Sequence, residues 1–139
     1  MKDPGKSIRA RLLNIAKKEN LSFQLVIIRY MHERLLYRIS LSDYSNSFCL
    51  KGGALMYIYT LEKTRPTRDI DFLGSDIPYD KSFVETVFRM ICSISYPPDA
   101  IFFDSGSSSC WRNCVLTYRY LGEFEIKYQF NINSDTWKI

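Results

Sequence analysis

The sequence predicts an α+β domain, and two observations support this prediction. Apolar residues recur at helical spacings over the first forty residues. In the second half, apolar and polar residues alternate as they do in half-buried strands. The chain has 139 residues, 46% of them hydrophobic and 24% charged, which is ordinary for a folded globular protein. We therefore expect one domain over residues 1–139.

Turn-forming residues separate the predicted elements. The predicted helices cover residues 7–18, 21–39, 54–61 and a segment that starts near Ser82. The predicted strands cover residues 48–50, 69–74, 100–103, 110–120 and 123–131, and the last two form a hairpin. Glu85 follows Ser82 at the spacing of a capping box, so Ser82 is expected to cap the fourth helix.

Positive charge is concentrated at the front of the chain. Residues 1–40 contain nine Lys or Arg against three acidic residues, which gives +6 there and leaves −2 for the rest of the net +4. A basic helical segment suits a polyanionic partner such as RNA. It is equally typical of the solvated face of an amphipathic helix, so both interpretations stay open.

Targeting signals and disulfides are not predicted. No apolar run approaches the roughly 18 residues that a membrane span needs, and the first residues lack the apolar stretch of a signal peptide, so the cytoplasm is the expected compartment. The four cysteines are therefore expected to be free thiols. They are Cys49, Cys92, Cys110 and Cys114, and no second cysteine or histidine pair completes a zinc site with the last two.

A glycine pair is the first candidate for chemistry. Gly52 and Gly53 stand between a predicted strand and a predicted helix. Backbone N–H groups and the positive end of the helix dipole at such a turn suit phosphate oxygens, and glycine permits a close approach. Lys51 directly precedes the pair. The pattern favours a loop that faces nucleotide phosphates, although a Gly-Gly pair by itself is most often only a turn.

Two aligned carboxylates are the second candidate. Asp69 and Asp71 lie two residues apart on a predicted strand, sixteen positions after the second glycine, so both side chains point to one face. Carboxylate oxygens are the ligands that Mg²⁺ prefers when it bridges to substrate phosphates. Arg65 and Arg68, just upstream, could meet phosphate charge. Together with the glycine pair, these residues indicate a nucleotide site.

The last predicted strand has a polar face that is open to two interpretations. Phe124, Ile126, Tyr128 and Phe130 share one face, and Glu123, Glu125, Lys127, Gln129 and Asn131 share the other. The polar face is expected to be wet or catalytic, or else an ordinary solvent-facing strand surface. His32 is expected to be structural or exposed, because no catalytic partner for it can be named.

The sequence resembles the AbiEii/AbiGii-type nucleotidyltransferase toxins of bacterial abortive-infection and toxin–antitoxin systems. The resemblance rests on residues 48–55 (FCLKGGAL) and 65–74 (RPTRDIDFLG), and more loosely on residues 7–13 and 29–38. It implies a DNA polymerase β-like fold, a mixed sheet flanked by helices, here with two helices in front. It also implies Mg²⁺-dependent transfer of a nucleoside monophosphate from NTP to an acceptor, tRNA in some members, and a cognate antitoxin as partner.

The resemblance assigns roles residue by residue. Gly52 and Gly53 would bind the nucleotide phosphates with support from Lys51, and Asp69 and Asp71 would hold the metal ions. Family members usually continue into a helical C-terminal region, so residues 1–139 would be the core without that region.

One position departs from the family pattern. A third carboxylate, the general base, normally follows in a Gln-x-Asp segment, where this chain has Gln129, Phe130 and Asn131. An amide cannot accept a proton as a carboxylate can, so the role would pass to Asp135 or Glu125, or be lost. Two hypotheses follow: an active RNA-directed nucleotidyltransferase, or a catalytically impaired or truncated module that binds nucleotide or a partner protein.

Overall fold

The computed structural model describes residues 3–60, 67–103, 115–118, 124–129 and 137–138. Its helices are α1 (Pro4–Glu19), α2 (Phe23–Leu41), α3 (Gly52–Thr60), α4 (Lys81–Ser93) and the 3-10 turn η1 (Pro97–Asp99). Its strands are β1 (Phe48–Lys51), β2 (Asp69–Gly74), β3 (Phe102–Phe103), β4 (Val115–Tyr118), β5 (Phe124–Gln129) and β6 (Trp137–Lys138). The α+β class is confirmed, and the single domain over residues 1–139 stays a prediction.

Four strands form the main sheet in the order β1-β2-β5-β4. Every described pair in it is antiparallel, whereas a sheet of mixed strand direction was expected. The predicted hairpin is present as β4 and β5. A separate pair, β3 with β6, is also antiparallel. The long strand β2 therefore lies between β1 and β5, in the interior of the sheet.

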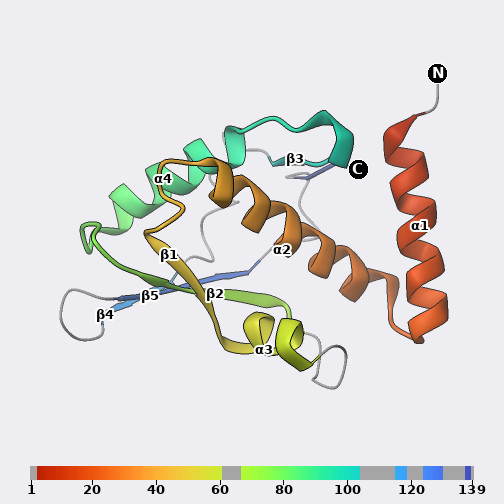
Figure 1. Ribbon diagram of the computed structural model, residues 1–139, viewed down its shortest axis with the longest axis horizontal. Helices are drawn as coiled ribbons and strands as arrows, with labels where there is room; N and C mark the ends of the chain where they lie inside the picture. The colour runs from red at the N-terminus through yellow and green to blue at the C-terminus, as the bar shows by residue number, and fades with distance from the viewer. Residues whose placement is uncertain (1–2, 61–66, 104–114, 119–123, 130–136, 139) are drawn as a thin grey trace.

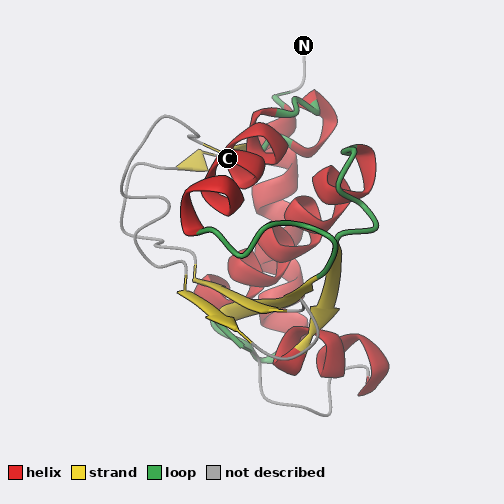
Figure 2. Ribbon diagram, turned by 90° about the vertical axis from the view of Figure 1, so that its left-hand side faces the viewer, coloured by secondary structure: helices red, strands yellow, loops and turns green. Residues whose placement is uncertain are grey.

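One face of the sheet is covered by α2 and α4, while α3 lies on the other side, as Figures 1 and 2 show. Alternation along β2 buries Ile70 and Phe72 toward the covering helices. The rings of Phe48, Phe72 and Phe88, from β1, β2 and α4, meet with centroids 5.0 to 6.2 Å apart. This aromatic cluster fixes the sheet against α4.

Helix α1 stands beside α2 at the end of the molecule away from the sheet (Figure 1). The Asp3 side chain caps it by accepting a hydrogen bond from the Gly5 N–H at 3.0 Å, and Pro4 occupies the first helical position. Asn20 ends it in the left-handed conformation, with φ 53°. Ile8 and Leu12 are buried, so the predicted amphipathic character is correct.

The predicted capping box of α4 is wrong. Asp80, not Ser82, caps the helix, and its carboxylate accepts a hydrogen bond from the Ser82 N–H at 2.9 Å. Aspartate is as good a cap as serine, and Ser82 lies inside the first turn, where its N–H needs an acceptor. The helix therefore begins at Lys81, one residue before the predicted start.

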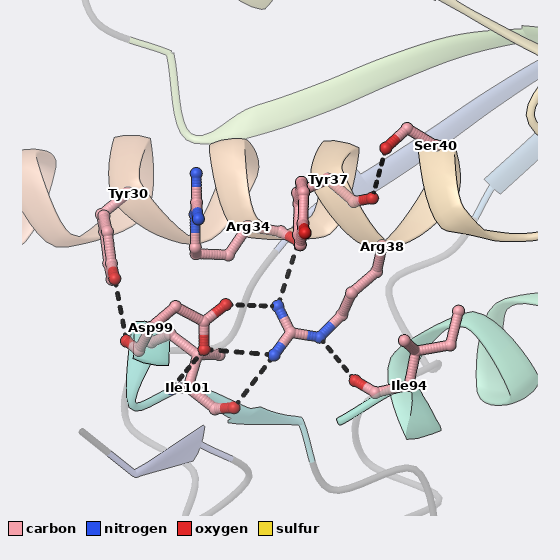
Figure 3. A network of polar contacts seen from close by, with 8 residues as sticks. All are labelled: Tyr30, Arg34, Tyr37, Arg38, Ser40, Ile94, Asp99 and Ile101. Carbon is pink, nitrogen blue, oxygen red and sulfur yellow. Dashed lines mark hydrogen bonds and ion pairs between the residues drawn. The ribbon is translucent and has the colours of Figure 1, made fainter. Parts of the chain in front are cut away.

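A buried ion pair joins α2 to the segment after α4 (Figure 3). Arg38 and Asp99 meet through two contacts, at 2.8 and 3.3 Å, and the two side chains are each 1% exposed. The other Arg38 donors reach the carbonyls of Ile94, Arg34 and Ile101 at 2.9 to 3.1 Å. Every N–H group of the guanidinium is thereby satisfied, as a charge in the core requires.

Within the described residues, Cys49 is exposed and Cys92 is buried, and both are free thiols as predicted. Cys110 and Cys114 lie outside the described residues. None of the helices in the described part of the chain combines the length and the apolar character needed to cross a lipid bilayer.

Removal of one partner of the Arg38–Asp99 pair should strongly destabilise the fold. We expect Asp99→Ala to lower the free energy of unfolding by about 3 to 5 kcal/mol, because it leaves an uncompensated guanidinium in the core. Urea denaturation followed by circular dichroism measures this. Glu85→Ala is the matched control: it removes the exposed Lys81–Glu85 contact of 3.9 Å and should cost less than about 1 kcal/mol. Equal losses of unfolding free energy in the two variants would show that the buried ion pair contributes no more to stability than the exposed one.

Candidate nucleotide site

The glycine turn lies directly against a strand carboxylate. Gly52 has φ +68°, a conformation that L side chains rarely adopt, and it begins α3 immediately after β1. A Cβ atom added at Gly52 would lie 2.6 Å from Oδ2 of Asp71, and one at Gly53 would lie 3.2 Å from Cβ of Thr67. The chain therefore requires glycine at position 52 for its backbone angle and for the approach of Asp71.

The two aspartates share one face of β2, as predicted. Ile70 and Phe72 are buried on the opposite face, whereas Asp69 and Asp71 are half-buried. The Asp69 backbone is fixed by Thr67, whose hydroxyl accepts from the Asp69 N–H and donates to the Asp69 carbonyl, both at 3.2 Å. Strand register pairs Lys51 with Asp71, so the lysine before the glycine turn stands beside the second carboxylate.

The polar face of β5 adjoins the same carboxylates. Register places Lys127 opposite Asp71 and Gln129 opposite Asp69. Ile126 is fully buried and Glu125 is half-buried, which agrees with the predicted alternation for the described side chains. Lys51 and Glu125 form an ion pair, although they come from strands on either side of β2. The sheet therefore gathers carboxylates and an ammonium group from three strands onto one surface.

Some of the predicted site residues cannot be located. Arg65, Asn131 and Asp135 lie outside the described residues, so their positions relative to Asp69 stay predictions. Arg68 is described, and its side chain is exposed. Its backbone forms a hydrogen bond with His32 of α2.

His32 has a structural environment, in agreement with the expectation from sequence. It is 6% exposed, and burial lowers its pKa to about 4, a shift that the hydrogen bond with the Arg68 backbone partly opposes. The imidazole is therefore neutral at pH 7. It links α2 to the residue just before Asp69, so it helps to place the start of β2.

Arg29 is a positioning residue that the sequence analysis did not single out. It donates to Glu19 at the end of α1 at 3.1 Å and to the Tyr57 hydroxyl of α3, and its guanidinium lies 5.3 Å from the Tyr57 ring centroid. No residue of α3 is fully buried, and this contact adds to the packing of α3 on β1 and β2. The partners are 10 and 28 residues away in sequence, and no local pattern predicts such a contact.

A divalent metal fits the donor chemistry of this surface. Asp69 and Asp71 supply hard carboxylate oxygens on one strand face, which suits Mg²⁺. Among the described residues, no group of three or more His, Cys, Asp or Glu side chains is close enough to hold a metal ion. Mg²⁺ usually keeps several waters and binds through one or two carboxylates plus substrate phosphates, and Asp69 with Asp71 fits that pattern.

An antiparallel sheet with helices, a glycine turn that opens a helix, and paired aspartates on the adjacent strand together define a nucleotidyltransferase-like α+β domain. The family model described as nucleotidyl transferase AbiEii toxin of type IV toxin–antitoxin systems matches residues 34–133. The chain belongs to this family, which implies a nucleotide substrate and a cognate antitoxin. No curated protein and no solved structure matched the chain.

Substitution of the two glycines should separate their roles. Gly52→Ala should destabilise the protein by at least about 1 to 2 kcal/mol, because alanine disfavours a left-handed backbone and its Cβ would displace the Asp71 carboxylate. Gly53→Ala should change stability by less than about 1 kcal/mol, because alanine suits a helix and the contact with Thr67 is milder. Urea titration tests this, and equal effects would contradict the assigned role of Gly52.

Burial of neutral His32 predicts a specific loss of stability in acid. The unfolded chain binds a proton near pH 6.5 and the folded chain only near pH 4, so stability is complete above pH 6.5 and falls as the pH approaches 4. The loss from this group is about 3 kcal/mol. His32→Gln should remove it, so the difference in unfolding free energy between the two proteins should depend on pH within this window. A difference that is constant with pH would refute the assignment.

Proposed function

We propose that this chain transfers a nucleoside monophosphate from an NTP to an RNA acceptor, with tRNA as the leading candidate, in a Mg²⁺-dependent reaction in the cytoplasm. The observation that carries the proposal is the approach of the Gly52 turn to the Asp71 carboxylate. Nucleotidyl transfer needs a phosphate-binding turn and metal-binding carboxylates within reach of the same substrate, and the Gly52 turn with Asp71 would supply both.

Asp69 and Asp71 would be the catalytic metal ligands. Both are half-buried on the strand face away from the core, with carboxylate oxygens as donors. A bound Mg²⁺ neutralises phosphate charge and favours ionisation of an attacking hydroxyl. Thr67 holds the Asp69 backbone from the adjacent turn, and the Gly52 turn approaches the Asp71 side chain. These contacts would orient the two carboxylates before the substrate binds.

Gly52 and Gly53 would bind the triphosphate through backbone N–H groups at the start of α3. Lys51 would support them as a catalytic cation, because strand pairing sets it beside Asp71. Arg65 and Arg68, from the connection before β2, would add positive charge against the phosphates. Lys51 forms an ion pair with Glu125, so the nucleotide phosphates would compete with this carboxylate for the Lys51 ammonium group.

The acceptor hydroxyl needs a base, and Asn131 cannot serve as one. Glu125 shares the strand face of the aspartates, yet its carboxylate already accepts a hydrogen bond from Lys51. An engaged carboxylate is less available to take a proton, which favours Asp135 as the base or a slower reaction without one. Loss of a general base costs about 10² to 10⁴ in rate.

The second candidate function is non-catalytic: a module that binds nucleotide and the cognate antitoxin without transferring a nucleotidyl group. The observation in its favour is the amide of Asn131 at the position where the resemblance implies a carboxylate. The glycine turn and both aspartates would then serve binding alone.

Incubation with Mg²⁺, a tRNA pool and each labelled NTP in turn tests the leading proposal. Label should appear on RNA with the unmodified chain and should be lost with Asp69→Asn, because the amide removes a charged metal ligand. Asp43→Asn, at an exposed turn residue, is the control that should transfer normally. Unchanged transfer by the Asp69 variant would refute the metal site.

Asn131→Asp separates the two candidate functions. If transfer is limited by the missing base, the substitution should raise the rate by up to about 10² to 10⁴. NTP binding without transfer in both the original chain and this variant would favour the non-catalytic module. The binding measurement is equilibrium dialysis with the labelled NTP that binds most tightly.

A further inference from the structure

A groove lies between α1, α2 and the segment around η1. Its volume is about 510 Å³, within the roughly 300 to 1,000 Å³ of typical ligand sites. The lining mixes basic and aromatic side chains over an apolar floor. The residues that matter here are Arg11, Arg29, Arg34, Tyr30, Tyr96 and Glu33.

The carboxylates near the groove do not neutralise all of its arginines. Asp99 is engaged by Arg38 in the core, and Glu19 is engaged by Arg29. In the described part of the chain, no carboxylate lies within ion-pair distance of Arg11 or Arg34. Arg11 donates a hydrogen bond to the Ser7 hydroxyl at 3.4 Å, one turn back on the same helix. Glu33 also lines the groove and interacts electrostatically with Arg29 and Arg34, but among the residues that the structure describes it forms no ion-pair contact with Arg11 or Arg34. Arg11 and Arg34 therefore face the groove without a direct ion pair to a described residue and can bind an anionic partner.

Arg34 is held in a defined orientation at the groove. Its guanidinium carbon lies 5.6 Å from the ring centroid of Tyr30 and 5.4 Å from that of Tyr37. Figure 3 shows it beside Tyr30, directed away from the Arg38 and Asp99 network. Its Nε atom is buried and has no hydrogen-bond partner among the described residues. Buried donors are usually satisfied by protein or by ordered water, so this N–H group has hydrogen-bonding capacity left over within the described residues.

The aromatic side chains are fixed as well. The Tyr30 hydroxyl donates to the Asp99 carbonyl at 2.8 Å, and the Tyr96 ring packs edge-on against Tyr37 with centroids 4.9 Å apart. Both tyrosines line the groove and remain half-exposed. Rigid rings beside unpaired arginines are the combination that binds single-stranded nucleic acid, with bases stacked on rings and phosphates on guanidinium groups.

We infer that the groove between α1 and α2 binds a single-stranded segment of RNA. The inference rests on the proposed function in one respect: the RNA would be the acceptor that receives the nucleotidyl group. Arg29 lines this groove and also reaches Tyr57 of α3, so the groove and the helix after the glycine turn share a residue. Helix α1 and the part of α2 before Arg34 precede the segment matched by the family model, so most of the groove lining comes from outside that segment.

The test measures binding without catalysis. Fluorescence anisotropy follows a labelled single-stranded RNA of about 12 nucleotides, within the range of known single-strand sites, in EDTA and without NTP. The protein carries Asp69→Asn in every case. Arg11→Gln with Arg34→Gln should raise Kd about ten-fold and should reduce the slope of log affinity against log salt by about 1.4, at about 0.7 for each phosphate contact.

Two further variants keep the result interpretable. Lys6→Gln with Lys17→Gln removes the same charge from exposed positions of α1 outside the groove and should change Kd by less than about two-fold. Arg11→Gln alone keeps the Arg34 packing intact and should lower the salt slope by about 0.7. This single variant replaces the double groove variant in the test if circular dichroism shows that the double variant is unfolded.

Three results would overturn the inference: no RNA binding, equal weakening by the groove and control variants, or tighter binding of a duplex than of the single strand. Its failure is distinct from failure of the proposed function. RNA binding that depends on Arg11 and Arg34, without nucleotidyl transfer, would support the RNA-binding groove and contradict the proposed enzymatic activity. Nucleotidyl transfer by a protein whose RNA affinity is unchanged by the Arg11 and Arg34 substitutions would support the proposed activity and contradict the RNA-binding groove.

Discussion

The ion pair between Arg38 and Asp99 is the constraint on which the arrangement of helices depends. It lies in the core, and the guanidinium also donates to backbone carbonyls before and after η1. A charge pair at this depth is stable only when every donor has an acceptor, so α2 can occupy only the position that satisfies them all. Helix α2 is thus fixed relative to the segment that follows α4, and both helices cover the same face of the sheet.

Helix α2 in turn places the parts of the candidate site. His32 reaches the backbone of Arg68, just before the paired aspartates, and Arg29 reaches Tyr57 in the helix that follows the glycine turn. These contacts tie α2 to α3 and to the residue just before β2. Pairing of β1 with β2 sets the glycine turn beside Asp71. Helix α2, which contributes no proposed ligand, supports both parts of the site through these two contacts.

In the candidate site, the backbone at Gly52 lies close to the carboxylate of Asp71. Gly52 accepts the positive φ angle and leaves room for the Asp71 carboxylate, so a phosphate bound at the start of α3 would lie near the proposed metal ligands. The ion pair of Lys51 with Glu125 crosses the intervening strand and would be exchanged for substrate contacts. Under the proposed function, the contacts of the Gly52 turn and of Thr67 would hold the two carboxylates in place for electrostatic stabilisation of the transferring phosphate.

The sequence by itself determined the α+β class, the main elements, the shared face of Asp69 and Asp71, and the glycine turn, because these follow from periodicity and backbone preference within short windows. It also supported the family through motifs at residues 48–55 and 65–74. Only the tertiary structure decided the strand order, the cap at Asp80, the burial of Arg38 with Asp99, and the contact of Gly52 with Asp71. Most of these features join residues that lie far apart along the chain, and the helix cap depends on which of two suitable neighbouring side chains accepts the hydrogen bond. The physical reason is that buried polar groups find their partners through the packing of the whole fold, which a local sequence pattern does not specify.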